Sequence, residues 1–509
     1  MKPRFYLTTP IYYVNDAPHI GHAYTTLACD VLARFKRLDG HEVFFLTGTD
    51  EHGQKVEKAA HDAGQEPKAF TDKVSANFRD LARVMGISND DFIRTTEPRH
   101  YAACAAMWQR LADNGALYLG HYEGWYAVRD EAFYGEDELT TGPDGVKRAP
   151  SGAPVEWVRE PSWFFRLSEW GPKLLDFYDA HPDFIGPASR RNEVTSFVRG
   201  GLTDLSVSRT SFKWGVPVPN DPDHVMYVWL DALTNYITAT GWPEDGPRAK
   251  FWPADLHMVG KDIVRFHAVY WPAFLMAAGL APPKRVYAHG WWTNEGQKIS
   301  KSLGNVIDPL ALVAEFGLDP VRFFLLREVP FGQDGDFSRA ALNRRLNGDL
   351  ANDLGNLAQR TLAFIAKNLA PEVPAPGAFT PADTALLDAA RALVGTLRTE
   401  LDRQAFHAAL EAVWVVVRAA NAYIAEQAPW ALRKTDLARM GTVLWVLLET
   451  IRHVAVLLQP FMPTSMANML DQLGQGEGAR MLVALETPLA AGTALPPPAP
   501  IFAKVEMAA

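Results

Sequence analysis

The chain has 509 residues, a length that predicts about three domains, and its 48% hydrophobic and 21% charged residues are ordinary for a soluble globular protein. Its only two cysteines, Cys29 and Cys104, exclude a disulfide-rich fold and are too few for a cysteine zinc site. The net charge of −9 argues mildly against nucleic-acid binding, although a large protein can meet RNA with one locally basic face.

The N-terminus lacks the apolar run of a signal peptide, and no stretch approaches the roughly 20 apolar residues that span a bilayer, so we expect a cytoplasmic protein. Residues 4–9 predict a strand, residues 22–38 a helix and residues 42–46 a buried parallel strand. This order begins a Rossmann-type, doubly wound α/β domain, whose ligands bind beyond the carboxyl ends of the strands. The polar loops 10–21 and 47–54 are candidates for that site.

Residues 116–225 interrupt the α/β pattern with aromatic and turn residues, which predicts an inserted connective domain containing strands. Further strands are predicted at residues 225–229 and 257–260, and from residue 338 the pattern is almost wholly helical. The predicted domains are a split Rossmann domain (1–115 and 226–290), the insertion (116–225), a linking segment (291–337) and a helical bundle with a C-terminal tail (338–509).

The run His19-Ile20-Gly21-His22 stands between the first strand and its helix. A helix N-terminus and two imidazoles offer donors to a triphosphate, and a glycine lets an adenine ring approach the backbone. The alternative is an ordinary polar loop between a strand and a helix.

A second run, Lys298-Ile299-Ser300-Lys301-Ser302, lies between glycines at positions 296 and 304, which predicts a loop that can move. Two lysines three residues apart can neutralise the charge that develops on a phosphate during its transfer. Taken alone, this run also fits a solvated basic surface loop.

The two runs together, about 280 residues apart, resemble the paired signature of class I aminoacyl-tRNA synthetases. The narrower resemblance is to the methionyl-tRNA synthetases and extends over nearly the whole chain. It depends on the runs that begin at Thr9 (TPIYYVN), Gly48 (GTDEHG), Tyr227 (YVWLDA), Gly260 (GKDIVRFH) and Asp319 (DPVRFF). The resemblance implies a methionine–tRNA ligase, which forms methionyl-adenylate and pyrophosphate from L-methionine and ATP and then charges tRNA(Met).

The resemblance also implies the roles of individual residues on the ATP side. His19, Gly21 and His22 would contact ATP, and Gly260 and Asp262 would hold the ribose. Lys298, Ser300 and Lys301 would bind the phosphates while the methionine carboxylate attacks, with His19, His22, Lys298 and Lys301 as the catalytic set. Catalysis would then consist of positioning and charge stabilisation, and Mg²⁺ would accompany ATP as a phosphate-bound ion.

On the methionine side, Asp50 matches the carboxylate that binds the substrate ammonium, although it also fits a helix-capping aspartate. A thioether packs well against aromatic rings, whereas ordinary core packing is the alternative for each tryptophan. The residues that match the side-chain pocket are Ile11, Tyr13, Trp229, Ala232, Tyr236, Ile263, His267 and Trp271.

In the bundle, Asn352, Asn356 and Arg360 are spaced four residues apart on one helical face, and Trp430 follows a proline. The family reads its CAU anticodon at such positions, with amides and a guanidinium on base edges and a tryptophan as a stacking platform. The alternative is a solvated helix face and a tryptophan buried between helices.

The inserted region has no cysteine, so the zinc knuckle of many relatives is absent and no structural zinc is expected. The chain ends without the additional tRNA-binding domain that dimerises some relatives, so a monomer is expected. Small nucleotidyltransferases are much shorter, and synthetases for leucine, isoleucine or valine carry a large editing insertion. A cysteine-specific synthetase would need zinc-binding thiols, and a non-enzymatic RNA-binding paralogue would not need both intact motifs.

Overall fold

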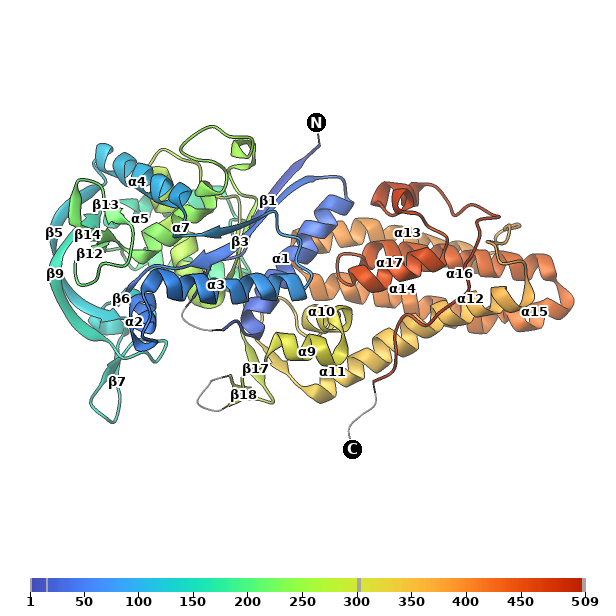
Figure 1. Ribbon diagram of the computed structural model, residues 1–509. Coiled ribbons are helices and arrows are strands. Elements are labelled where there is room, and N and C mark those ends of the chain that lie inside the picture. Colours follow the sequence, from blue (N-terminus) through green and yellow to red (C-terminus); the bar gives the residue numbers. More distant parts are fainter. Residues whose placement is uncertain (1, 15–16, 300–303, 506–509) are drawn as a thin grey trace.

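The computed structural model describes residues 2–14, 17–299 and 304–505, and its centre is a parallel sheet of seven strands (Figure 1). β1 (Arg4–Thr8) lies between β3 (Glu42–Asp50) and β15 (Leu256–Gly260). The spatial order is β10-β16-β15-β1-β3-β2, and β4 also pairs with β3, which confirms the predicted doubly wound α/β fold. The outer strands are β2 (Tyr12–Tyr13), β4 (Asp91–Arg94), β10 (Ile185–Gly186) and β16 (Val286–His289).

The elements predicted near the N-terminus form with shifted ends. α1 (Ile20–Leu38) begins two residues before the predicted start, directly after His19. β3 continues past residue 46 as far as Asp50, and its last seven residues are buried. Asp50 is therefore the final residue of a buried strand. It does not cap a helix, because the next helix, α2 (Gln54–Asp62), begins at Gln54 and has Gly53 at its N-cap.

The strand predicted at residues 225–229 is wrong beyond its first two residues. β14 (Asp221–Met226) ends there, and α7 (Val228–Thr238), which carries Trp229, follows with every residue buried. A continuous apolar run looks the same in a buried strand and in a buried helix, so periodicity did not separate them. β14 belongs to a separate antiparallel sheet with β12 (Ser208–Arg209) and β13 (Pro217–Val218).

The inserted region forms a second, antiparallel sheet at one end of the molecule (Figure 1). Its main pair is β5 (Leu117–Ala127) and β9 (Glu156–Phe165). The predicted continuous insertion over 116–225 needs correction, because β10 returns to the central sheet and pairs with β16. The remaining elements of this half are α3 (Pro67–Val84), α4 (Pro98–Asp113), β6 (Ala132–Tyr134), β7 (Thr140–Thr141), β8 (Lys147–Arg148), α5 (Gly171–Ala180), α6 (Ala188–Arg199), β11 (Leu205–Ser206) and α8 (Trp271–Ala277).

The predicted helical bundle forms the other end of the molecule (Figure 1). Two stretches, 406–435 and 437–458, are long and apolar enough to cross a membrane by length and composition. The second is α16 (Leu437–Leu458), which is buried from Met440 to its end, so its hydropathy is that of a core helix. The bundle also contains α11 (Arg339–Arg345), the π-helical η7 (Leu346–Gly355), α12 (Asn356–Asn368), α13 (Pro381–Asp402), α14 (Phe406–Gln427), α15 (Pro429–Thr435) and α17 (Pro463–Gln472).

α1 joins the central sheet to the bundle. In the middle of α1, the buried Asp30 accepts a hydrogen bond from the buried Arg322 at 2.7 Å. Arg322 belongs to α10 (Leu318–Arg327), which follows α9 (Pro309–Phe316), and it also donates to the Pro460 carbonyl between α16 and α17. Near the end of α1, Lys36 pairs with Asp402 of α13 at 2.6 Å. One helix therefore touches the loop beyond β1 at its start and the bundle at its end.

Candidate active site

His19 and His22 are fixed by the first turn of α1. The Nδ1 of His19 accepts the backbone N–H of Gly21, and the Nδ1 of His22 accepts the backbone N–H of His19, both at 3.1 Å. In a neutral imidazole one nitrogen accepts and the other carries the proton, so both Nε2 atoms are donors. The two rings lie 4.0 Å apart and present these N–H groups at a helix N-terminus.

The surroundings keep both imidazoles neutral near pH 7. Burial lowers the pKa of His19, and it lowers the pKa of His22 well below its usual value of 6.5. The neighbouring charges of His19 and Lys55 lower the pKa of His22 further. Gly21 is required by this geometry, because a Cβ there would lie 3.0 Å from the His19 ring and press against it. The predicted loop therefore offers neutral N–H donors, which suit phosphate oxygens.

Gly260 and Asp262 lie at the carboxyl end of β15, on the same edge of the sheet. The Asp262 carboxylate is exposed, accepts a hydrogen bond from the indole N–H of Trp291 at 3.2 Å, and raises the pKa of His19 electrostatically. A Cβ on Gly260 would lie 2.5 Å from Oδ1 of Asp262. The tertiary structure thus brings Asp262 near His19 and adds Trp291, an exposed ring that sequence reasoning missed.

Lys298 is the last residue of β18 (Gln297–Lys298), which pairs with β17 (Trp292–Asn294), and its side chain is exposed. On the other side, β17 pairs with β19 (Gly335–Phe337). The Lys298 carbonyl accepts a hydrogen bond from Asn305 at 3.0 Å, which ties the two ends of the loop. Ser300 and Lys301, predicted from the same motif, lie outside the described residues.

A small cavity opens beside the ends of β1 and β3. Seven of the nine predicted methionine-binding residues line it, while Pro10 and Leu233 were missed. The other two predicted residues, Ile263 and Trp271, do not line this cavity, and their part in methionine binding stays a prediction. The seven lining residues that were predicted are Ile11, Tyr13, Asp50, Trp229, Ala232, Tyr236 and His267.

The cavity contains buried polar atoms without a partner. Oδ1 of Asp50, the hydroxyl of Tyr13 and the indole nitrogen of Trp229 make no hydrogen bond to any described residue. Burial, with the nearby charges of Asp231 and Glu131, raises the pKa of Asp50 well above its usual value. Each unpaired buried polar group costs free energy, so these atoms are suited to pair with a ligand. A cationic group would supply the partner that the buried carboxylate of Asp50 lacks.

The side chains around the cavity pack tightly. The ring of Trp229 stacks on Phe266 at 3.8 Å, and the rings of Tyr13 and Trp229 meet edge to face at 6.4 Å. The enclosed space is about 10 Å³, room for a single water molecule. A larger substrate therefore requires the lining side chains to move apart. Phe266 was not predicted, because its contribution depends on a stack that forms only when η5 (Phe266–Tyr270) meets α7.

Hydrogen bonds orient the far end of the cavity. Nδ1–H of His267 donates to the Ile263 carbonyl at 2.9 Å, which leaves Nε2 to accept the hydroxyl of Tyr236 at 2.7 Å. Burial lowers the pKa of His267 to about 4, so the ring is neutral near pH 7. Trp271, behind Tyr236, donates its indole N–H to His257 at 3.2 Å. Ile263 and Trp271 thus hold lining residues in place.

Behind Asp50, Asp231 accepts hydrogen bonds from Nδ1 of His52 and Nε2 of His100, both at 2.7 Å. Burial alone raises the pKa of Asp231, but the two histidines lower it to about 2. The ligand atoms of His100, Cys104 and Asp231 lie within 4.8 Å of one another, a spacing that could hold a metal ion. The hydrogen bonds within the group already satisfy these atoms. The group could not be predicted from the sequence, because its three residues come from two helices.

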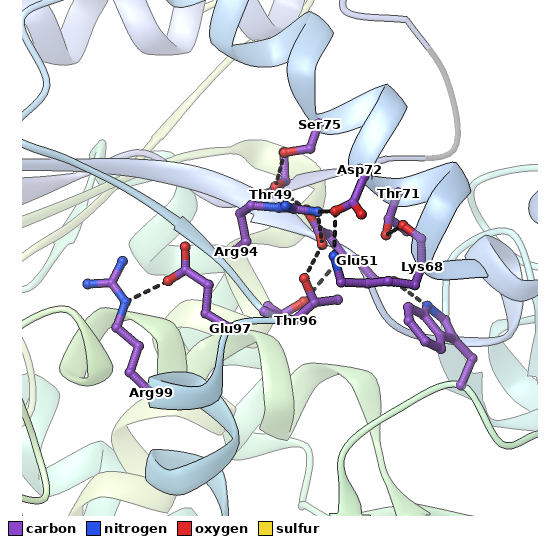
Figure 2. A network of polar contacts seen from close by, with 12 residues as sticks. Thr49, Glu51, Lys68, Thr71, Asp72, Ser75, Arg94, Thr96, Glu97 and Arg99 are labelled. Carbon is purple, nitrogen blue, oxygen red and sulfur yellow. Dashed lines mark hydrogen bonds and ion pairs between the residues drawn. The ribbon is translucent and has the colours of Figure 1, made fainter. Parts of the chain in front are cut away.

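The carboxylate next to Asp50 has the opposite surroundings (Figure 2). Glu51 accepts Nε of Arg94 at 2.6 Å, Nη2 of Arg94 at 2.9 Å and the hydroxyl of Thr96 at 2.5 Å, and Thr49 donates to it as well. Arg94 in turn pairs with Asp72 of α3. The backbone carbonyl of Glu51 accepts the indole N–H of Trp214 from the inserted region. This network fixes the segment that directly follows Asp50 at the end of β3.

The predicted RNA-reading residues gather on one exposed face of the bundle. Asn352, Asn356 and Arg360 are exposed along η7 and α12, and Trp430 begins α15 with 45% of its surface exposed. The Arg360 guanidinium lies over the Trp430 ring at 5.7 Å. The alternative of a tryptophan buried between helices is therefore wrong, and the four side chains form one surface.

The chain matches a family model described as tRNA synthetases class I (M) over residues 5–362, and one described as the anticodon binding domain of methionyl tRNA ligase over residues 373–509. The methionine–tRNA ligase of Mesorhizobium japonicum is 58% identical over 98% of both chains, and that of Rickettsia bellii is 57% identical over 99% of this chain and 100% of its own. A Mycobacterium tuberculosis methionyl-tRNA synthetase, solved in complex with methionyl-adenylate, is 54% identical with a TM-score of 0.97, covering 99% of this chain and 100% of that one.

Proposed function

The chain belongs to the methionyl-tRNA synthetase family, and from this premise we propose that its Asp50 cavity binds methionine and its His19–His22 loop binds ATP phosphates. As a class I methionine–tRNA ligase, the enzyme activates L-methionine with ATP to methionyl-adenylate and pyrophosphate, then transfers methionine to the 3′ end of tRNA. The family establishes the reaction, and the proposal concerns which side chains of this chain perform it.

The observation that carries the proposal is the set of unpaired polar atoms in the cavity. Asp50 is a buried carboxylate with one free oxygen, and an ammonium group at that oxygen would supply the missing hydrogen bond and the missing charge. Beyond it, the thioether of methionine would contact Trp229, Tyr236 and His267, because sulfur packs favourably against aromatic rings. The amino acid is then oriented with its carboxylate toward the loop that carries His19 and His22.

On the ATP side, the Nε2–H groups of His19 and His22 would donate to the phosphates, and Asp262 would accept the ribose hydroxyls. Lys298, with Ser300 and Lys301 beyond it, would stabilise the charge that builds up on the phosphates as the carboxylate attacks the α-phosphorus. The neutral N–H donors of His19 and His22 would bind phosphate oxygens and are not ligands for a metal ion. Mg²⁺ would be held mainly by the triphosphate and water, and it would neutralise further charge there. No general base is needed, since the carboxylate is already a nucleophile.

On the RNA side, we propose that Asn352, Asn356 and Arg360 read base edges of a CAU anticodon while Trp430 provides the stacking platform. Their shared exposed face supports this assignment. We also propose that the enzyme is monomeric and cytoplasmic. Two buried free thiols, Cys29 and Cys104, are compatible with a reducing compartment.

We further propose that the enzyme needs no structural zinc, because His100, Cys104 and Asp231 are already satisfied by hydrogen bonds. Elemental analysis of the purified protein, followed by activity after chelation, tests this. One zinc ion per chain, or activity lost on zinc removal and restored by zinc, would contradict the proposal.

The central experiment is ATP–pyrophosphate exchange with each of the twenty amino acids. We expect methionine alone to support rapid exchange, and Asp50→Asn to raise the KM for methionine strongly because the ammonium loses its ionic partner. Leu310→Ala, at an exposed side chain of α9 outside the cavity lining, serves as a control. If Asp50→Asn left the KM for methionine unchanged, the assignment of the cavity would be wrong.

A further inference from the structure

Lys55 is a partly buried cation beside the proposed methionine cavity that neither motif includes. It occupies the first turn of α2, which follows Asp50 and the short connection over residues 51–53. Its Nζ lies over the ring of Tyr13, 4.8 Å from the centroid. Tyr13 is one of the residues that line the cavity, so the ammonium contacts the cavity wall.

The backbone of Lys55 is held by the inserted region. Its N–H donates to Oε1 of the buried Glu131 at 2.8 Å, so this carboxylate caps the start of α2. The hydroxyl of Tyr126 bonds the other oxygen of Glu131, and the hydroxyl of Tyr227 donates to its carbonyl at 2.8 Å. Glu131 adopts a φ of 50°, a conformation that an ordinary side chain keeps only when its surroundings enforce it. Lys55 is therefore placed by a rigid anchor.

The ammonium pairs with no carboxylate of the described residues. Among the residues that the structure describes, no carboxylate lies within 4.0 Å of Nζ, and no hydrogen bond from Nζ is found. The charges of Glu131 and Asp50 act on it from further away, while burial lowers its pKa. A desolvated cation stacked on one aromatic ring still has three N–H donors to satisfy. The Lys55 ammonium can therefore donate hydrogen bonds to an anionic group of a bound substrate.

Lys55 stacks on a residue of the cavity wall and is close enough to both proposed substrate sites for its charge to act there. Its charge is felt by Asp50, which would hold the methionine ammonium, and by His22, which would hold the ATP phosphates. The reaction brings a carboxylate against a triphosphate, and two anions repel each other at close range. A fixed cation between them would offset that repulsion without any covalent step.

We propose that Lys55 is a further substrate-binding residue, whose ammonium donates to an anionic oxygen where the methionine carboxylate meets the α-phosphate. This inference rests on the proposed function of the cavity. The shared chemistry is an anionic oxygen, which the carboxylate of methionine or the α-phosphate of ATP could supply, and the two sources differ in what a variant loses.

The test compares Lys55→Met with Lys58→Met, a matched control on the same helix whose lysine is exposed and pairs with Asp62. Dissociation constants are measured by calorimetry for methionine and for methioninol, which keeps the ammonium and thioether but has an alcohol in place of the carboxylate. ATP–pyrophosphate exchange supplies kcat and the KM for ATP, and thermal unfolding shows that both variants are folded.

If Lys55 contacts the carboxylate, Lys55→Met weakens methionine binding roughly 10- to 150-fold, which corresponds to the loss of one charged hydrogen bond. The dissociation constant for methioninol stays unchanged. If it contacts the α-phosphate, methionine affinity is retained and the exchange rate at saturating methionine falls by a similar factor. Either result supports the proposal, and Lys55→Arg should restore part of the loss.

The proposal is overturned if Lys55→Met matches Lys58→Met in every measured constant, or if Lys55→Met weakens the binding of methionine and of methioninol equally. Asp50→Asn separates this failure from a failure of the proposed function. That variant should weaken methionine and methioninol alike, since both carry the ammonium. If Asp50→Asn affected neither ligand, the cavity itself would be misassigned, whatever Lys55 does.

Discussion

Asp50 and Glu51 are consecutive buried carboxylates with opposite surroundings. Glu51 has its oxygens satisfied by Arg94, Thr49 and Thr96, whereas Asp50 keeps one oxygen without a partner in the described structure. A satisfied buried carboxylate stabilises its loop, and an unsatisfied one destabilises the fold in the absence of a ligand. The hydrogen-bond partners, rather than the residue type, separate the structural carboxylate from the functional one.

This contrast predicts stability changes of opposite sign. Glu51→Gln should lower the free energy of unfolding by about 3 kcal/mol, because it leaves the largely buried Arg94 short of its partner. Asp50→Asn should raise it by about 1 kcal/mol, because it removes an unpaired buried charge at the expense of activity. Urea unfolding of both variants without substrate measures the two changes. A destabilised Asp50→Asn would show that Asp50 is structural.

His267 predicts a pH dependence of stability. Its pKa is about 4 in the folded protein and about 6.5 when unfolded, so between these values the unfolded chain binds the extra proton. The free energy of unfolding therefore falls as the pH drops from 6.5 to 4, by about 3 kcal/mol from this residue.

His267→Asn removes that titration. Its stability relative to the unmodified enzyme should therefore improve by the same amount as the pH is lowered through this window, whatever the substitution costs at pH 7. Unfolding curves at pH 7, 5.5 and 4 provide the comparison. Parallel stability profiles for the two proteins would contradict the assignment of a neutral, buried His267.

At the scale of elements, α1 carries two functions along its length. Its first residues hold His19 and His22, its middle holds Asp30 against Arg322, and its end pairs with the bundle through Lys36. With 19 residues at ~1.5 Å each, the helix spans about 28 Å. One continuous helix therefore connects the bundle with the ATP side of the site.

Arg322→Met should lower the free energy of unfolding by about 3–5 kcal/mol, because Asp30 is left as a buried charge without its main partner. Adding Asp30→Asn should recover part of that loss, since the stranded charge disappears. Arg398→Met is the control: its pair with Asp39 is half-exposed and is worth less than about 1 kcal/mol. Equal losses for Arg322→Met and Arg398→Met would remove Arg322 from its role at the junction.

At the scale of the whole molecule, the cavity and the exposed bundle face lie in separate parts of the chain. The sheet and its inserted strands form one end, and the helices that carry Asn356 and Trp430 form the other (Figure 1). Damage to the RNA face should therefore leave methionine activation intact.

Trp430→Ala should lower tRNA charging about 5- to 150-fold, the loss of one stacking interaction of ~1–3 kcal/mol, while ATP–pyrophosphate exchange and the melting temperature stay unchanged. Val415→Ala, at another exposed apolar side chain of the bundle, is the matched control and should affect neither reaction. Equal loss of both activities in Trp430→Ala would exclude it from the anticodon site.

The sequence by itself determined the fold class, the two signature motifs and most of the cavity wall. These features are local or periodic: a strand–helix–strand order, a four-residue motif at the start of α1, and a helical second half. The resemblance then assigned seven of the nine lining positions, Asp50 among them, as they stand in the structure. Local propensity and motif spacing carry this information because neighbouring residues alone produce it.

Only the tertiary structure decided how those residues are supported. It turned the run after Met226 into a helix, returned β10 to the central sheet, and left Ile263 and Trp271 outside the cavity lining. It also gave hydrogen-bond partners to both oxygens of Glu51 but left one oxygen of Asp50 without a partner among the described residues, and it placed Lys55 over Tyr13. The physical reason is that burial and hydrogen-bond satisfaction depend on side chains far apart in the sequence, which meet only when the sheet, the insertion and the bundle pack together.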